Sequence, residues 1–210
     1  MEANLRAGVA IYNAGGYHAA HDAWEDHWLG LETGTEDELF LHGLIQFTAA
    51  VYHARNYNWS GATGLATSGR EYLEPLPGSY RGIEVGAVRS YLTHLGSDPE
   101  LIERREPLAL TLHGERLGLA DLQFEATAVA AGVLAEERGD DREEAVIEDA
   151  VEYARADLEK TNSAIVPLLF DYVRRPGSRD IVLQRLGEHV DRRRNREQDV
   201  SGLFEPREEE

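Results

Sequence analysis

The segment from Tyr17 to Trp28, YHAAHDAWEDHW, concentrates side chains that can hold a metal ion or move a proton. His21 and Glu25 are four positions apart, so a helix would place both side chains on one face. This pair can chelate one divalent metal ion, with His53 or Gln46 as a third ligand and Asp22 as a base or as an orienting residue. Such a site leaves a coordination position for an attacking water. One interpretation is therefore a metal-dependent hydrolase.

A second interpretation is a buried network of hydrogen bonds around the same pair. On a helical projection, the aromatic side chains of Tyr17, Trp24 and Trp28 fall within about 60° of His21. Glu25 lies on the other flank of His21, and a carboxylate that leaves water needs polar partners. The network would be architectural and line a small pocket. In a third, metal-free interpretation, His21 and Glu25 carry protons. The partners expected from the next helix share one stripe: His42, Gln46 and His53.

Helical periodicity predicts an all-α chain, a multihelical bundle. Thr35 stands three residues before Glu38, the spacing of a capping box, and Asn58 can cap the helix that follows it. The expected helices span residues 3–13, 17–29, 35–56, 58–72, 84–95, 124–137, 142–160, 163–174 and 179–194.

The helical period is interrupted between residues 108 and 119. Leucines alternate with other residues on both sides of His113-Gly114, a pair that can form a two-residue turn. We therefore expect one small β-hairpin near residues 108–119.

Three parts are expected along the chain. Residues 1–96 form an N-terminal helical bundle with the motifs described above. Residues 97–195 form the hairpin and C-terminal helices packed on that bundle. Residues 196–210 form an acidic tail that ends in EPREEE.

Acidic residues strongly outnumber basic ones. The 39 acids and 21 bases give a net charge of −18, and Lys160 is the single lysine. This balance resembles the surface of a protein from a salt-rich cytoplasm. It disfavours nucleic acids and anionic membranes as partners. A nucleic-acid role would start at the basic segment DRRRNRE, residues 191–197, but its acids dilute the charge.

Several classes of protein are disfavoured by what the sequence lacks. The chain has no cysteine, which excludes disulfides and thiolate metal sites. It has no visible signal peptide and no apolar stretch long enough to span a bilayer, so a soluble, cytoplasmic protein is expected. A glycine-rich phosphate loop and a nucleophile elbow are also missing.

Two motif blocks, YNAGGYHAAHDAWEDHW and GLIQFTAAVYHARNYNWSGA, resemble those of the uncharacterised helical family catalogued as domain of unknown function 309. The resemblance covers about residues 10–75, a third of the chain. It implies a compact multihelical fold and brings no established activity. Asp22 stands where the family usually has Glu, and Tyr57 where it often has Gly. The matching positions are Asn13, Gly15, Tyr17, His21, Glu25, Trp28, Gly43, Leu44, Ile45, Gln46, His53, Asn58, Gly61 and Ala62.

The leading expectation is a helical-bundle protein whose His/Glu/Gln cluster is architectural around a small pocket. One alternative is the metal-dependent hydrolase, for which a divalent metal ion is the implied cofactor. The other is an interaction module, in which the helices from residue 142 onward dock a partner or a second copy in a homo-oligomer.

Overall fold

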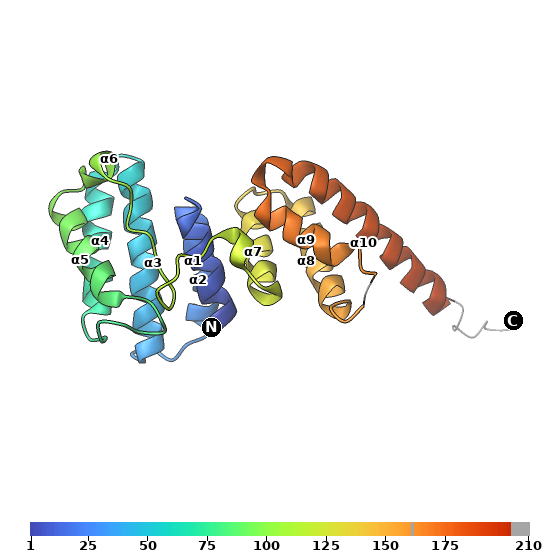
Figure 1. Ribbon diagram of the computed structural model, residues 1–210, viewed down its shortest axis with the longest axis horizontal. Coiled ribbons are helices and arrows are strands. Elements are labelled where there is room, and N and C mark those ends of the chain that lie inside the picture. Colours follow the sequence, from blue (N-terminus) through green and yellow to red (C-terminus); the bar gives the residue numbers. More distant parts are fainter. Residues whose placement is uncertain (161, 203–210) are drawn as a thin grey trace, which may run out of the picture. The chain divides into compact units, whose positions relative to one another are not determined.

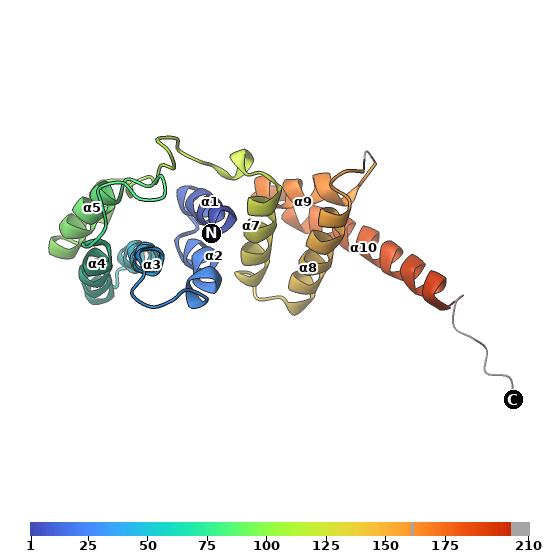
Figure 2. The same ribbon diagram turned by 90° about the horizontal axis from the view of Figure 1, so that it is seen from below.

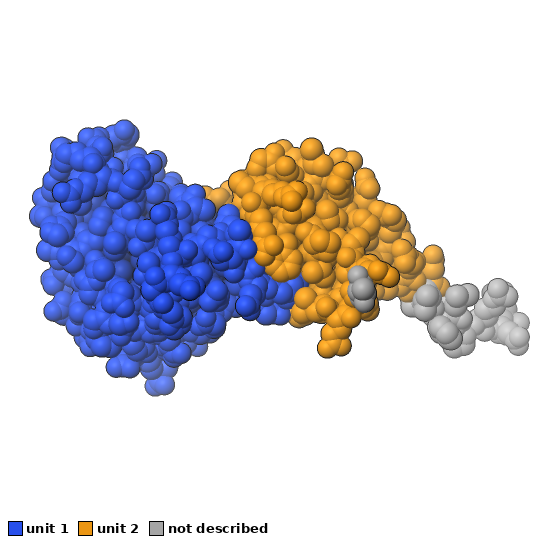
Figure 3. All heavy atoms as spheres, in the orientation of Figure 1, with its two compact units in different colours: residues 1–133 blue, residues 134–210 orange. Residues whose placement is uncertain are grey.

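A computed structural model describes residues 1–160 and 162–202 of the chain. The chain divides into two compact units, Met1–Val133 and Leu134–Glu210, which are coloured separately in Figure 3. The described residues form helices and short 3-10 turns and contain no β-strand, so the all-α prediction is confirmed. The domain boundary expected after residue 96 falls inside unit 1. Of the expected tail, residues 196–202 continue the last helix and residues 203–210 lie outside the described residues.

Unit 1 is an array of helices in which each of the first five helices packs against the next along the chain. Figure 2 looks roughly along these helices and places α3 between α2 and α4. The last helix, α7, begins in unit 1 and runs past its end at Val133. The elements are α1 (Glu2–Asn13), α2 (Tyr17–Leu29), α3 (Glu36–Arg55), α4 (Trp59–Leu73), α5 (Val85–Ser97), α6 (Leu101–Arg104), the 3-10 turn Leu119–Asp121 and α7 (Phe124–Glu136) (Figure 1).

The starts of α3 and α4 follow the capping residues in the sequence. The side-chain oxygen of Thr35 accepts a hydrogen bond from the backbone N–H of Glu38, and that of Asn58 accepts one from the N–H of Gly61. Both satisfy an N–H that the first turn of a helix leaves without a partner. Only half of the expected capping box forms, because the Glu38 carboxylate turns to other donors.

The contact between α1 and α2 depends on a glycine. A Cβ atom at Gly8 would stand 2.1 Å from Nε1 of Trp24, well inside van der Waals contact, so no larger residue fits there without movement. Trp24 is completely buried, and Ala20 and Ala23 on the same helix are buried with it. This burial sets the inner side of α2, and the polar residues of the helix lie toward its edge.

The β-hairpin expected near residues 108–119 does not form. His113 and Gly114 make the expected two-residue turn, with positive φ angles of 54° and 83°. The arms pair only next to the turn, where Leu112 and Glu115 form an isolated bridge, because backbone groups further from the turn have other partners. The side chain of Asn13 donates to the carbonyl oxygens of Leu110 and Leu117, each at 2.9 Å, and accepts from the N–H of Leu110 at 3.0 Å. The segment is therefore a loop clamped to the end of α1.

In unit 2, the described helices pack against one another around a small apolar core. The core includes Ile147, Leu169, Val173, Leu186 and Val190, all buried. The elements are α8 (Asp141–Ala156), α9 (Ile165–Arg174), the 3-10 turn Pro176–Ser178 and α10 (Arg179–Gly202). None of the helices described in either unit combines the length and the apolar character needed to cross a bilayer.

Candidate functional site

Four polar side chains of α2 lie together along its edge. Nδ1 of His18 is 3.4 Å from Oδ2 of Asp22, and Nδ1 of His21 is 3.6 Å from Oδ1 of the same carboxylate. Nε2 of His21 is 3.5 Å from Oε2 of Glu25. We call these residues the α2 cluster: His18, His21, Asp22 and Glu25.

The α2 cluster is open to solvent on one side. The Glu25 side chain is 42% exposed and that of His21 is 25% exposed, so the pair is not enclosed as the second interpretation expected. His18 is exposed, and its ring contacts Tyr52 of α3 edge to face, with 5.4 Å between ring centroids. Within the described residues, one ligand atom each from His18, His21 and Asp22 lies within 4.8 Å of the others. His18 was not among the ligands predicted from the sequence, although a helical projection places it within about 60° of His21, on the same flank as Glu25.

The expected partners on α3 and the aromatic Tyr17 have other neighbours. Nδ1 of His53 lies 2.8 Å from the side-chain amide nitrogen of Asn58, and the group of ligand atoms that meet within 4.8 Å does not include it. A Cβ atom at Gly69 of α4 would stand 3.0 Å from Cβ of Gln46, so Gln46 lies at the α3–α4 contact. Tyr17 contacts Tyr12 edge to face, and burial raises its pKa.

The buried carboxylate near the aromatic residues of α2 is Glu38 of α3. The indole N–H of Trp28 donates to Oε1 of Glu38 at 2.9 Å, and the backbone N–H of Gly34 donates to Oε2 at 3.1 Å. Nδ1 of His42 lies 3.3 Å from Oε1. Glu38 is only 7% exposed. Burial alone would raise the pKa of this carboxyl, but the hydrogen bonds from Trp28, Gly34 and His42 outweigh it and hold the pKa below its ordinary value.

His42 is held between two aromatic rings as well as by Glu38. Its ring stacks on Tyr72 of α4, with 3.6 Å between centroids and 23° between planes, and lies 4.6 Å from the ring of Trp28. Trp28 and His42, two of the expected network residues, therefore meet around Glu38. The sequence signal was the spacing of four between Glu38 and His42, which places both on one face of α3.

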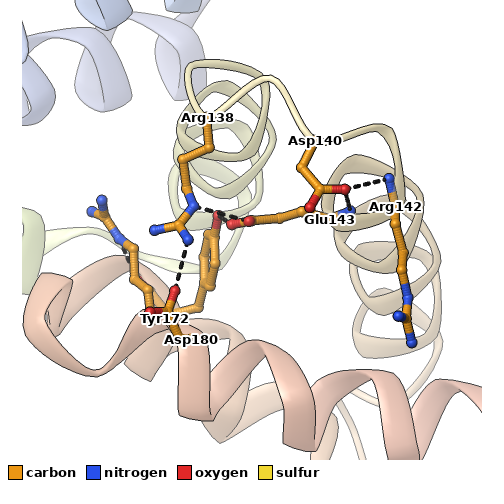
Figure 4. Close-up of polar contacts among 7 residues, drawn as sticks. Arg138, Asp140, Arg142, Glu143, Tyr172 and Asp180 are labelled. Atoms are coloured by element: carbon orange, nitrogen blue, oxygen red, sulfur yellow. Dashed lines mark hydrogen bonds and ion pairs between the residues drawn. The ribbon is translucent and has the colours of Figure 1, made fainter.

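A second buried carboxylate lies in unit 2. Glu143 of α8, 3% exposed, accepts a hydrogen bond from the hydroxyl of Tyr172 at 2.6 Å and one from Nε of Arg138 at 2.9 Å (Figure 4). Arg138 also donates to Asp180 at 2.6 Å, so the network joins α8, α9 and the start of α10. The acidic run EERGDDREEAVIED contains Glu143 and reads as a solvated surface. The burial of Glu143 could not be predicted from this run alone, because its hydrogen-bond partner Tyr172 lies on another helix, α9.

These arrangements differ in what they can do chemically. The carboxylates of Glu38 and Glu143 are buried and have several hydrogen-bond donors each, which suits a structural role. The α2 cluster combines two imidazoles with carboxylates that solvent can reach, which suits binding of a cation or transfer of a proton. The α2 cluster is therefore the candidate functional site.

Comparison with known proteins gives a family without an assigned activity. A protein of Aquifex aeolicus (strain VF5) that bears the name "Uncharacterized protein" is 27% identical over 103 residues. The aligned part covers 46% of this chain and 31% of that protein, so it spans less than a third of the relative. Residues 5–65, from α1 into α4, match the family described as Domain of unknown function (DUF309), which confirms the resemblance seen in the sequence motifs.

Proposed function

We propose that unit 1 binds a divalent metal ion through His18, His21 and Asp22 of α2. The observation that carries this proposal is that ligand atoms of these three residues lie within 4.8 Å of one another on one helix. In a tetrahedral site with bonds of about 2.1 Å, neighbouring ligand atoms are about 3.4 Å apart. Nδ1 of His18 and Nδ1 of His21 stand 3.4 Å and 3.6 Å from the Asp22 carboxylate oxygens. Small rotations of these side chains would suffice to admit an ion.

Glu25 supports the same arrangement from the other side of His21. Its carboxylate faces Nε2 of His21 at 3.5 Å, and Nδ1 of the same ring faces Asp22. A histidine that binds a metal through one ring nitrogen commonly donates the other N–H to a carboxylate, which fixes its tautomer and orientation. Glu25 is thus proposed as an orienting residue.

Three protein ligands and access to solvent leave at least one coordination position for water. An ion bound in this way would lower the pKa of a water at that position and so supply a nucleophile near neutral pH. The two-imidazole, one-carboxylate donor set suits Zn²⁺, and also Co²⁺, Mn²⁺ or Fe²⁺. The reaction class that fits this site is metal-assisted hydrolysis. His18 takes the role of third ligand that was expected of His53.

Metal titration of the purified, untagged protein tests the proposal. After treatment with a chelator, we expect one equivalent of Zn²⁺ or Co²⁺ to bind per chain, with the visible spectrum of Co²⁺ indicating the donor set. His18→Ala and His21→Ala should each remove this binding. Glu25→Gln should weaken it by roughly 10- to 100-fold, the effect usual for a residue that orients a ligand.

Two matched variants keep the test specific. His94→Ala removes an exposed histidine of α5 in the same unit and should leave binding unchanged. His53→Ala separates the two ligand sets, because it should matter only if His53 is a ligand. Binding that persists in His21→Ala, or is absent from the wild-type protein, would overturn the proposal and favour an architectural role for the cluster. The interaction role of the helices from residue 142 onward and the homo-oligomer stay predictions.

A further inference from the structure

Unit 2 contains a cavity whose lining has more cationic than acidic side chains. Its volume is about 780 Å³, within the usual range for small-molecule sites. It lies between the residues at the start of α9, Ser163 to Ile165, and α10. We call it the basic cavity, and its cationic or titratable lining residues are Lys160, His189, Arg192, Arg193 and Arg196.

The residues from α10 follow the spacing of one helical face. His189, Arg192, Arg193 and Arg196 occupy positions i, i+3, i+4 and i+7, so their side chains form one stripe along the helix. Like charges at these spacings repel each other. Three arginines on one stripe are unusual in a chain with a net charge of −18. A bound anion would reduce the repulsion between them.

Protein carboxylates neutralise only part of this charge. Asp157, which is buried, accepts from Lys160 at 2.5 Å and lies 2.9 Å from Arg193. Arg193 also donates to Glu197 at 3.1 Å. Arg192 is 3.9 Å from Glu188. Within the described part of the chain, Arg196 has no hydrogen-bond or ion-pair partner. The cavity therefore keeps an excess of positive charge.

The start of α9 adds hydrogen-bond donors to the same cavity. Ala164, the N-cap residue, provides no side-chain cap, and the first turn contains no acidic residue. Ser163 accepts from the N–H of Val166 at 3.4 Å and so leaves other N–H groups of that turn to bind an anion. The positive end of the helix dipole favours negative charge at this place.

We propose that the basic cavity binds the phosphate group of a small phosphorylated molecule. Guanidinium groups and helix N-termini are both well matched to phosphate oxygens, which accept several hydrogen bonds at once. A nucleic acid offers the same group, but its extended backbone would meet the acidic surface of the chain. Asp157 and Glu197 also line the cavity and pair with Lys160 and Arg193, so the positive charge left for a ligand suits a short anion.

Calorimetric titration of the full-length protein with inorganic phosphate at constant ionic strength tests this proposal. We expect saturable binding at one site per chain. Arg196→Gln should weaken phosphate binding by roughly tenfold, the usual effect of losing one charged hydrogen bond. This variant removes no hydrogen bond or ion pair with the described protein residues, so loss of a structural polar contact would not explain weaker binding.

Arg185→Gln is the matched control. It removes the same charge from an exposed position of α10 outside the basic cavity and should leave the phosphate Kd unchanged. Equal weakening in both variants, or no binding by the wild-type protein, would contradict the proposal. A short single-stranded DNA oligomer, titrated in competition with phosphate, distinguishes the sources of the phosphate group. Displacement of phosphate by the oligomer at lower concentration than by a phosphate monoester such as ribose 5-phosphate would overturn the assignment to a small molecule.

Discussion

The indole N–H of Trp28 donates to the carboxylate of Glu38 at 2.9 Å, across the connection between α2 and α3. The same carboxylate accepts from the backbone N–H of Gly34 in that connection and faces His42 one turn further along α3. One buried acid thus ties the end of α2, the loop and the start of α3 together. It gives this helix pair a buried polar contact that favours one arrangement of the two helices.

Glu38→Gln should lower the free energy of unfolding by about 2 kcal/mol at pH 7, because it weakens charged hydrogen bonds to a buried group. The pKa of Glu38 is lowered in the folded protein, so its charge stabilises the fold above the unfolded-state pKa of about 4.3. That contribution is lost as the pH falls through the folded-state pKa. The difference between wild type and variant, measured by urea denaturation, should therefore shrink below about pH 4.

Glu36→Gln provides the comparison for this measurement. Glu36 is exposed in the first turn of the same helix, so its substitution should change stability by no more than about 0.5 kcal/mol. A difference between wild type and Glu38→Gln that stays constant from pH 7 to pH 3 would contradict the role given to the Glu38 charge.

Asn13→Ala should release the loop formed by residues 108–119. The variant removes three hydrogen bonds to Leu110 and Leu117, which predicts a loss of about 2–4 kcal/mol in the free energy of unfolding. The amide of Leu110 should also exchange with solvent faster, as measured by hydrogen exchange. Asn56→Ala removes one exposed hydrogen bond to Tyr52 and should cost much less. Unchanged exchange at Leu110 in Asn13→Ala would refute the clamp.

Tyr172→Phe should destabilise unit 2 by about 1–3 kcal/mol, because it takes a donor from the buried carboxylate of Glu143. Burial, followed by the hydrogen bond to Glu143 and the charge of that carboxylate, raises the pKa of Tyr172. This contribution to stability is therefore present below the unfolded-state pKa of about 10 and declines at higher pH. Amide exchange in α8–α10 reports the effect. Tyr153→Phe, which loses a more exposed bond to Glu197, should change exchange less, and equal effects would count against the network.

Local signals in the sequence predicted the helices well. The bounds of α2 agree with the expectation, and Thr35 and Asn58 cap the helices they were expected to cap. Each of these features depends on residues within one or two helical turns. The hairpin prediction was wrong because the decisive partner, Asn13, is about a hundred residues away in sequence. The pair His113-Gly114 predicts the turn itself, but whether the two flanking segments pair as strands depends on contacts with residues distant in sequence.

The candidate site could be predicted only in part for a related reason. A helical projection places His21 and Glu25 on one face, but it does not give the depth of that face in the fold. Glu25 is partly exposed, and Glu38 is the acid that is buried beside Trp28. His18 was not predicted as a ligand, although it shares the flank of Glu25 in the projection. A metal ligand needs other ligands on the same surface. Asp22, four residues after His18, is such a neighbour.

The contact between Gly8 and Trp24 means that substitutions at positions 8 and 24 constrain each other. With the ring seated where a Cβ atom would otherwise be, a larger residue at position 8 is compatible only with a smaller or displaced side chain at position 24. Relatives that share this helix pair should therefore vary at the two positions together. A chain with a larger residue at position 8 that retains the tryptophan at position 24 must have α1 further from α2.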